Sequence, residues 1–153
     1  MRIVVISDSH KAIGKLLEII EIHKNAADLF IFLGDIDDDF DTVLDVYPSI
    51  KYYRVVGNND WYSQHPTEQI VDFHGKRIFF AHGHTYGVKH GYEKIIAHSK
   101  EINADICLFG HTHLQYTDYD DGLYIMNPGS VRMGKYGMID ILEKGTILLP
   151  ADI

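Results

Sequence analysis

The sequence predicts an α/β fold, a four-layer α/β/β/α sandwich in which two mixed sheets pack face to face and helices flank them. The first half of the chain alternates short β-branched runs with apolar residues at helical spacing, which is typical of parallel strands joined by helices. After Pro66 the pattern changes to short strands separated by turn residues, and the end of the chain reads as all β. The second pattern indicates a second sheet.

Three buried strands are expected in the first half, at Ile3–Ile6, Leu29–Leu33 and Tyr52–Val56. Apolar residues at helical spacing between Ile13 and Ile20 predict a helix after the first strand, and Val43–Tyr47 indicates a short helix before the third. Such a β–α alternation predicts a largely parallel sheet.

The second half begins with an expected antiparallel hairpin, formed by Gln69–Phe73 and Arg77–Ala81. A helix is expected at Tyr92–Ile102 and a further buried strand at Ile106–Phe109. The remaining strands are separated by turn sequences at Asp120-Asp121-Gly122 and Glu143-Lys144-Gly145.

The chain of 153 residues is expected to form a single domain, residues 1–153, because it contains no repeat or linker. Its 14 basic and 22 acidic residues give a net charge of −8, which argues against a stable complex with nucleic acid. An acidic protein that binds a phosphate needs a strong local positive charge, and divalent cations would supply it.

A cytoplasmic location without membrane attachment is expected. No apolar run approaches the ~20 residues of a bilayer span, and the apolar segment at the N-terminus is too short for a secretory signal. The single cysteine, Cys107, rules out an internal disulfide and fits a reducing compartment. Because it lies in an apolar strand, we interpret it as a core residue and not as a nucleophile.

Polar residues of metal-ligand type recur where the expected strands end. They are Asp8, His10, Asp35, Asn58, His82, His111 and His113. Open α/β sheets place their sites at such strand ends. Carboxylate, carboxamide and imidazole ligands suit Mn²⁺, Fe²⁺, Co²⁺, Ni²⁺ or Zn²⁺. Because no cysteine is among these candidates, a catalytic centre is favoured over a closed structural zinc site.

These residues lie in motifs that resemble the signature of the calcineurin-like metallophosphoesterase superfamily. The motifs are Asp8-Ser9-His10, Gly34-Asp35, Gly57-Asn58-Asn59-Asp60, His82-Gly83-His84 and Gly110-His111-Thr112-His113. A later segment, Asn127-Pro128-Gly129-Ser130, resembles a loop of the small YfcE-type phosphodiesterases. The likeness therefore covers most of the chain.

The resemblance implies two divalent metal ions in each chain, with Mn²⁺ the first expectation. It assigns Asp8, His10 and His113 to one ion, Asn58, His82 and His111 to the other, and Asp35 to a bridge between them. Two ions ~3.5–4 Å apart would polarise a bridging water, and the resulting hydroxide would attack the phosphate ester.

The chain departs from the family at Asn59, where many members have a histidine that assists the leaving group. Asparagine cannot deliver a proton, so the leaving-group scope of the enzyme is in question. Asn59, Asp60 and His84 are the candidate catalytic residues, with Asp60 more of an orienting partner. Asn58, Asn59 and His84 are also candidate substrate contacts, and His84 is favoured in that role over metal ligation.

Other polar segments receive structural interpretations. The acidic run Asp37-Asp38-Asp39 with Asp41 is expected to be a solvated loop and helix N-terminus. Whether Asn127–Ser130 faces the centre or is only a tight turn is left open. Ordinary surface positions are expected for the remaining histidines, His23, His65, His74, His90 and His98.

The expected function is metal-dependent hydrolysis of a small phosphodiester. A phosphomonoesterase or nucleotidase is the first alternative, because the same centre supports both reactions. A second is a non-catalytic scaffold like the retromer subunit of the superfamily, but there the metal set is incomplete. A small phosphate ester is the expected partner, and a homo-oligomer is left open.

Overall fold

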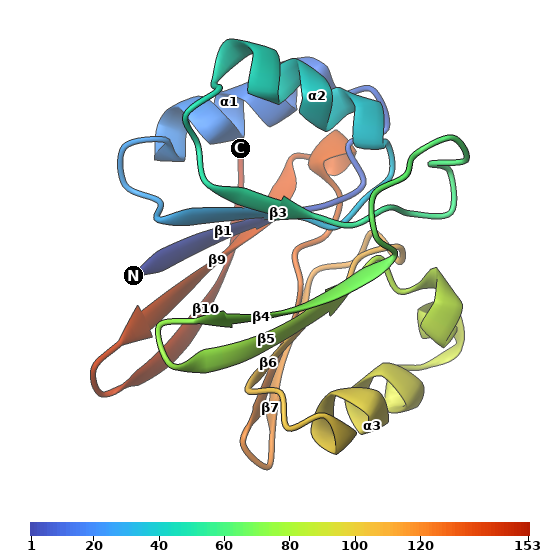
Figure 1. Ribbon diagram of the computed structural model, residues 1–153, viewed down its shortest axis with the longest axis vertical. Coiled ribbons are helices and arrows are strands. Elements are labelled where there is room, and N and C mark those ends of the chain that lie inside the picture. The colour runs from blue at the N-terminus through green and yellow to red at the C-terminus, as the bar shows by residue number, and fades with distance from the viewer.

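The computed structural model describes residues 1–153 (Figure 1). Its helices are α1 (Ile13–His23), α2 (Asp37–Val46) and α3 (Glu93–Glu101), with single 3₁₀ turns at His84–Tyr86, Val88–His90 and Val131–Met133. Its strands are β1 (Arg2–Ile6), β2 (Leu29–Phe32), β3 (Tyr52–Arg54), β4 (Glu68–Phe73), β5 (Lys76–Ala81), β6 (Ile106–Leu108), β7 (Tyr116–Asp120), β8 (Leu123–Asn127), β9 (Lys135–Leu142) and β10 (Gly145–Asp152).

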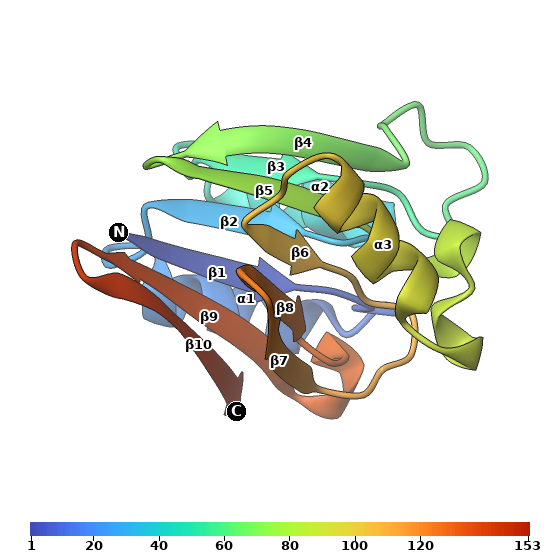
Figure 2. The ribbon, with the colours of Figure 1, turned by 90° about the horizontal axis from the view of Figure 1, so that it is seen from below.

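The strands form two mixed five-stranded sheets. The first has the order β10-β9-β1-β2-β3, in which β1, β2 and β3 are parallel, β9 is antiparallel to β1, and β10 is antiparallel to β9. The second has the order β4-β5-β6-β8-β7, with β5, β6 and β8 parallel and an antiparallel strand at each edge. The two parallel centres place their carboxyl ends at the same end of the molecule (Figure 2).

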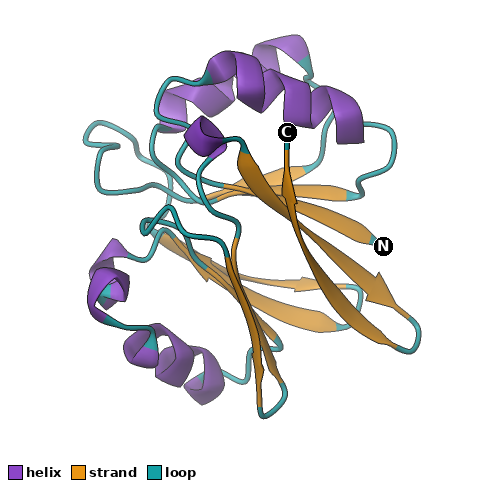
Figure 3. Cartoon of the chain, turned by 180° about the vertical axis from the view of Figure 1, so that it is seen from behind, coloured by secondary structure: helices purple, strands orange, loops and turns teal.

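The helices cover the outer faces of the sheets, so the molecule has four layers. Figure 1 shows α1 and α2 above the first sheet and α3 below the second, and the view from behind in Figure 3 shows the same arrangement. No helix has the length and apolar composition that a bilayer span requires.

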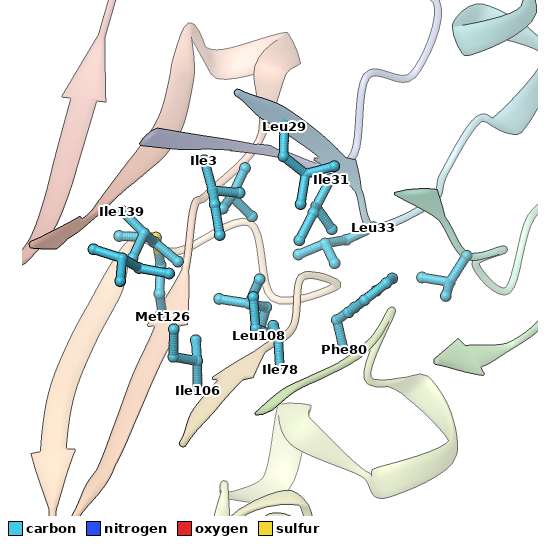
Figure 4. Close-up of a cluster of buried hydrophobic side chains, with 13 residues drawn as sticks. Ile3, Leu29, Ile31, Leu33, Ile78, Phe80, Ile106, Leu108, Met126 and Ile139 are labelled. Carbon is cyan, nitrogen blue, oxygen red and sulfur yellow. The ribbon is translucent and has the colours of Figure 1, made fainter. Parts of the chain in front are cut away.

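Alternation along the strands builds the interior. In β1, Ile3 and Val5 point between the sheets, whereas Val4 and Ile6 pack against the helices. The cluster between the sheets combines β1 and β2 with residues such as Ile78 on the second sheet (Figure 4). Because both faces of the central strands are buried, these strands are continuously apolar and read as short β-branched runs.

The expected fold class is confirmed, and the differences lie at element ends. The helix expected at Val43–Tyr47 begins earlier, at Asp37, because the acidic run forms its first turn. The third strand ends at Arg54 instead of Val56, although Val55 and Val56 are still buried. Residues beyond Arg54 leave the sheet to form the loop that carries Asn58.

Candidate metal centre

The loops that follow β1, β2, β5 and β6 meet at one end of the sandwich. They carry six of the seven ligand candidates, Asp8, His10, Asp35, His82, His111 and His113, and the loop after β3 carries Asn58. In neighbouring parallel strands the following loops all begin at the carboxyl ends, on the same side of the sheet. This arrangement brings together segments more than a hundred residues apart in the chain.

The first group of donors is Asp8, His10 and His113. The Nε2 atom of His113 lies 3.1 Å from Asp8 Oδ1 and 3.2 Å from His10 Nε2. His10 Nε2 lies 3.5 Å from the same carboxylate oxygen. Asp8 is fully buried and His113 is exposed, so this half of the centre opens to solvent.

The second group contains Asp35 and His82, with Asp8 within reach of both. Asp35 Oδ2 lies 3.5 Å from His82 Nε2 and 3.9 Å from His10 Nε2, so its carboxylate stands between the two groups. His111 Nδ1 lies 3.1 Å from His82 Nε2. Asp8 Oδ1 also lies within 3.8 Å of His82 Nε2, so both carboxylates contact the two groups.

The donor set fits divalent cations. Two pairs of imidazole nitrogens face each other at 3.2 and 3.1 Å, each next to a carboxylate. Two ring nitrogens that face each other at this distance with lone pairs on both would repel, unless a proton or a cation lies between them. His82 Nδ1–H donates to the carbonyl of Leu33 at 2.8 Å, which leaves the Nε2 lone pair for a metal.

The loop after β3 attaches to Asp35 through Asn59. The Asn59 backbone N–H donates to Asp35 Oδ1 at 3.0 Å, and its side-chain amide donates to Oδ2 at 2.7 Å. Asn58, between Gly57 and Asn59, is exposed, and no hydrogen bond joins its side chain to another ligand candidate. The structure therefore shows a contact with Asp35 for Asn59 but none for Asn58 itself.

Asp60 holds the same loop to the loop after β2. Its Oδ2 accepts the backbone N–H groups of Gly57 at 2.6 Å and Asp35 at 3.0 Å, and its Oδ1 accepts that of Asp37 at 2.6 Å. A carboxylate engaged by three amides has little freedom to act on a substrate. These contacts agree with the expectation that Asp60 orients its neighbours.

Two glycines are required by close approach. A Cβ on Gly57 would lie 2.0 Å from Asp35 Oδ1, and one on Gly110 would lie 2.1 Å from Ser7 Oγ and 2.7 Å from Asp8 Oδ2. A side chain at either position would therefore displace a ligand candidate, Asp35 in the first case and Asp8 in the second. This explains in physical terms why Asn58 and His111 are each preceded by glycine.

Strained backbone accompanies the ligand candidates. Asp8, His10, Asp35, His111 and His113 all have positive φ, between 42° and 69°. Non-glycine residues pay for this conformation, of the order of 1 kcal/mol each, and such strain concentrates at functional sites. The turns direct Asp8 and His10 toward one group, and they send His111 and His113 toward the two different groups.

Charge is balanced within the buried part of the centre. Burial favours the neutral form of Asp8, but the hydrogen bond with His113, the charge of His82 and the hydroxyl of Ser7 outweigh it, so the pKa of Asp8 lies below its ordinary value. Burial together with the nearby charge of His82 lowers the pKa of His111 to about 4. At neutral pH these groups are thus a carboxylate and a neutral imidazole, the forms that bind metals.

His84 lies beside the centre on the 3₁₀ turn after His82. Its ring centroid is 5.5 Å from that of His82 and 6.1 Å from that of His111. Burial and the charge of His82 lower its pKa, and its Nδ1 is buried without a hydrogen-bond partner. Like His111, it belongs to neither donor group, but no hydrogen bond joins it to another ligand candidate.

The Asn127–Ser130 segment supports two ligand loops. The Asn127 amide donates to the carbonyl of Gly110 and to Thr112 Oγ1, both at 2.9 Å, and Ser130 Oγ donates to the carbonyl of Asp8 at 2.8 Å. Asn127 Oδ1 accepts the backbone N–H of Gly129, so the segment is also a tight turn. The alternative left open by the sequence is decided: Asn127 is buried and fixes a loop.

The acidic run also has a role that the sequence did not reveal. Asp39 is buried, and its Oδ2 accepts Ser9 Oγ at 2.5 Å and the backbone N–H of Lys11 at 2.7 Å. The expectation of a solvated segment is wrong for Asp37 and Asp39, because the first turn of α2 packs against the loop after β1. The sequence offered only two weak signals for this contact: Ser9 inside the first ligand motif, and Asp39 in the first turn of the helix that follows the next strand.

One further histidine differs from expectation. His23 was expected at the surface but is buried at the end of α1, where its Nε2 lies 3.0 Å from Tyr136 Oη. His98 is partly buried against Phe79 and Tyr86. The other three, His65, His74 and His90, are exposed as expected.

The sequence profile of the calcineurin-like phosphoesterase superfamily domain matches residues 1–141. The chain belongs to the calcineurin-like phosphoesterase superfamily. The Bacillus subtilis protein named "Probable metallophosphoesterase YsnB" is 31% identical over 134 residues, which are 87% of this chain and 76% of that protein. Phosphodiesterase YfcE of Escherichia coli is 32% identical over 81 residues, 49% of this chain and 40% of YfcE.

Solved structures show the same fold. Vps29 of Entamoeba histolytica, crystallised with Zn²⁺, superposes with a TM-score of 0.75 at 18% identity and covers 99% of both chains. At this identity the likeness concerns the fold alone. As a calcineurin-like phosphoesterase, the chain is a metal-dependent phosphoric ester hydrolase by family, and its Asp and His groups are candidate sites for divalent cations.

Proposed function

We propose that this protein hydrolyses small phosphodiesters with two divalent cations held by the seven ligand candidates. The observation that supports the proposal is the convergence of two facing imidazole pairs around the Asp8 and Asp35 carboxylates. Asp8, His10 and His113 would hold one cation, Asn58, His82 and His111 the other, with Asp35 between them. Mn²⁺ is the first expectation, and Ni²⁺, Fe²⁺, Co²⁺ and Zn²⁺ also suit these ligands.

When bound, the two cations would activate a bridging water as the nucleophile and neutralise charge on the phosphoryl oxygens. The pKa of Asp8 lies below its ordinary value and that of His111 is lowered to about 4, so at neutral pH these two groups are a carboxylate and a neutral imidazole. Asn59 and Asp60 fix Asp35 through its side chain and its backbone N–H respectively. No serine or cysteine nucleophile is needed, and Cys107 is fully buried in β6.

The structure adds a reason to expect weak protonation of the leaving group. The Asn59 amide is not only unable to deliver a proton but is already engaged with Asp35 at 2.7 Å. His84, with its buried unpartnered Nδ1, is the remaining imidazole beside the centre. We assign His84 to substrate contact.

The test is a turnover screen of phosphodiesters and phosphomonoesters with Mn²⁺, Ni²⁺ and Zn²⁺ in turn. Hydrolysis of diesters that is lost in Asp35→Ala, with metal content measured in both proteins, is the expected result, and the loss should exceed about a hundredfold. Faster hydrolysis of monoesters would favour a phosphomonoesterase or nucleotidase.

A non-catalytic scaffold is the remaining alternative, and the Vps29 fold gives it some support. A protein that binds metal tightly but hydrolyses none of the esters would establish that role. Asp45→Asn serves as a control, because Asp45 is exposed on the far half of α2. A cytoplasmic location, a single domain and the oligomeric state stay predictions.

A further inference from the structure

A pocket of about 350 Å³ opens beside the candidate metal centre, between the start of α2 and the loop after β3. Asn59 belongs to both places, because it lines the pocket and its side chain lies 2.7 Å from Asp35 Oδ2. Asn59 thus connects the pocket with the candidate centre. No step of the proposed hydrolysis uses the pocket.

The walls of the pocket are strongly acidic. Asp37, Asp38 and Asp41 line it together with Asp60. Arg54 partly offsets this charge, since its Nη1 lies 2.7 Å from Asp41 Oδ1 and 3.7 Å from Asp37 Oδ1. Four carboxylates against one guanidinium leave a surplus of negative charge, which disfavours an anionic occupant and favours a cationic one.

One carboxylate oxygen in this wall lacks a hydrogen-bond partner. The Asp37 side chain is 5% exposed; its Oδ2 accepts Ser63 Oγ at 2.7 Å, but its Oδ1 accepts no hydrogen bond. This oxygen is not exposed to solvent and faces the Arg54 guanidinium at 3.7 Å, so Asp37 would act on an occupant of the pocket through its charge and not by direct contact.

Two aromatic side chains stand at the mouth of the pocket. Trp61 is 82% exposed and Tyr62 is fully exposed, and both line the pocket. Their loop projects from the end of the sandwich in two perpendicular views (Figures 1 and 2). Aromatic faces, that of tryptophan above all, attract organic cations, and quaternary ammonium groups are recognised in this way.

We propose that this pocket receives an organic cation, a protonated amine or a quaternary ammonium group, carried by the alcohol part of the phosphodiester substrate. Trp61 would contact the cation through its ring face, and Asp37 and Asp38 would supply the opposite charge. A neutral nucleobase would stack on Trp61 but would leave the carboxylates uncompensated. The inference rests on the proposed function and names its substrate class.

The test compares esters that share one leaving group. They are p-nitrophenyl phosphorylcholine, p-nitrophenyl phosphorylethanolamine, the neutral isostere p-nitrophenyl 3,3-dimethylbutyl phosphate, and the p-nitrophenyl esters of thymidine and guanosine 5′-phosphate. In each, water adds to phosphorus, the P–O bond to the aryl group breaks, and p-nitrophenolate and a proton are released. Only the retained alcohol differs, so the ratio of kcat/KM values reports recognition in the pocket.

We expect the cationic esters to exceed the neutral isostere in kcat/KM by about tenfold. Trp61→Ala should lower that ratio about threefold and Asp38→Asn about twofold. Asp45→Asn, which removes the same charge from the same helix outside the pocket, should leave the ratio unchanged. The quaternary ester should lose more than the primary ammonium ester in Trp61→Ala, because aromatic faces recognise quaternary ammonium groups.

Equal values for the cationic and neutral esters, or a preference for a nucleoside ester, would overturn the proposal while hydrolysis itself stands. If no ester is hydrolysed with any metal, the proposed function fails, and a binding measurement then decides the pocket. Trp61 is the single tryptophan of the chain, so its fluorescence reports occupancy directly. Saturable quenching by choline but not by 3,3-dimethylbutan-1-ol is expected, and equal responses to both would overturn the inference.

Discussion

Replacing Asp60 by asparagine tests whether the loop after β3 positions Asp35. The change preserves the shape of the side chain but converts one of its two acceptor oxygens into an NH₂ donor. In the folded protein those oxygens accept three backbone N–H groups, from Gly57, Asp35 and Asp37. In either orientation of the new amide, at least one N–H loses its acceptor and faces another donor.

The structure sets the size of the effect. A hydrogen bond to a charged group contributes about 1.5–3 kcal/mol. Asp60 is only half-buried, so water replaces part of the loss, and we expect the free energy of unfolding to fall by about 2 kcal/mol. Because Asp35 is held through its own N–H, the affinity for metal should also fall, by about 10–100-fold as for other outer partners of metal ligands.

Urea unfolding and metal titration measure the two effects, and Asp45→Asn controls for the loss of one negative charge. A variant whose unfolding free energy stays within about 0.5 kcal/mol of the wild type, with unchanged metal affinity, would refute the reasoning. Loss of stability alone would assign Asp60 a structural role without a role in positioning Asp35.

Three further predictions concern single residues. Because Asn59 cannot supply a proton, aryl esters should be cleaved far faster than alkyl esters. Asn59→His should raise the rate for alkyl esters selectively, by up to about 10²-fold. A wild-type rate that does not depend on the pKa of the leaving group would contradict this. His23 has a lowered pKa, chiefly from burial and then from the charge of Arg2, so the unfolded chain binds its proton first as pH falls. Wild-type stability should therefore drop below about pH 6.5, more steeply than in His23→Gln, whereas equal slopes in urea midpoints would exclude His23 as the cause. Burial raises the pKa of Cys107 to about 12, so a thiol reagent should label it only after unfolding, and rapid labelling of the native protein would show that β6 opens.

The sequence by itself determined the architecture and the residues of the candidate centre. Continuous apolar runs such as Ile3–Ile6 specify strands buried on both faces, and the change of pattern after Pro66 specifies the second sheet. Ligand-type residues at strand ends specify a common location, because parallel strands open toward one edge. Asp8, Asp35 and His82 lie together as that reasoning requires.

The supporting network depended on the tertiary structure. The sequence did not predict the role of Asp39 and left that of Asn127 and Ser130 open, since an aspartate, asparagine or serine outside a regular element usually lies in a turn or a cap. Each became a partner of a ligand loop only when strands from distant parts of the chain met.

The same holds for the acidic pocket and for the buried position of His23. The acidic run reads as solvated because charge is normally exposed, and only the packing of α2 against two loops buries Asp37 and leaves its Oδ1 without a partner. Local sequence determines which side chains a segment offers and how its backbone alternates. Which of them become desolvated depends on contacts between segments far apart in the chain, and a single sequence does not encode those distances locally.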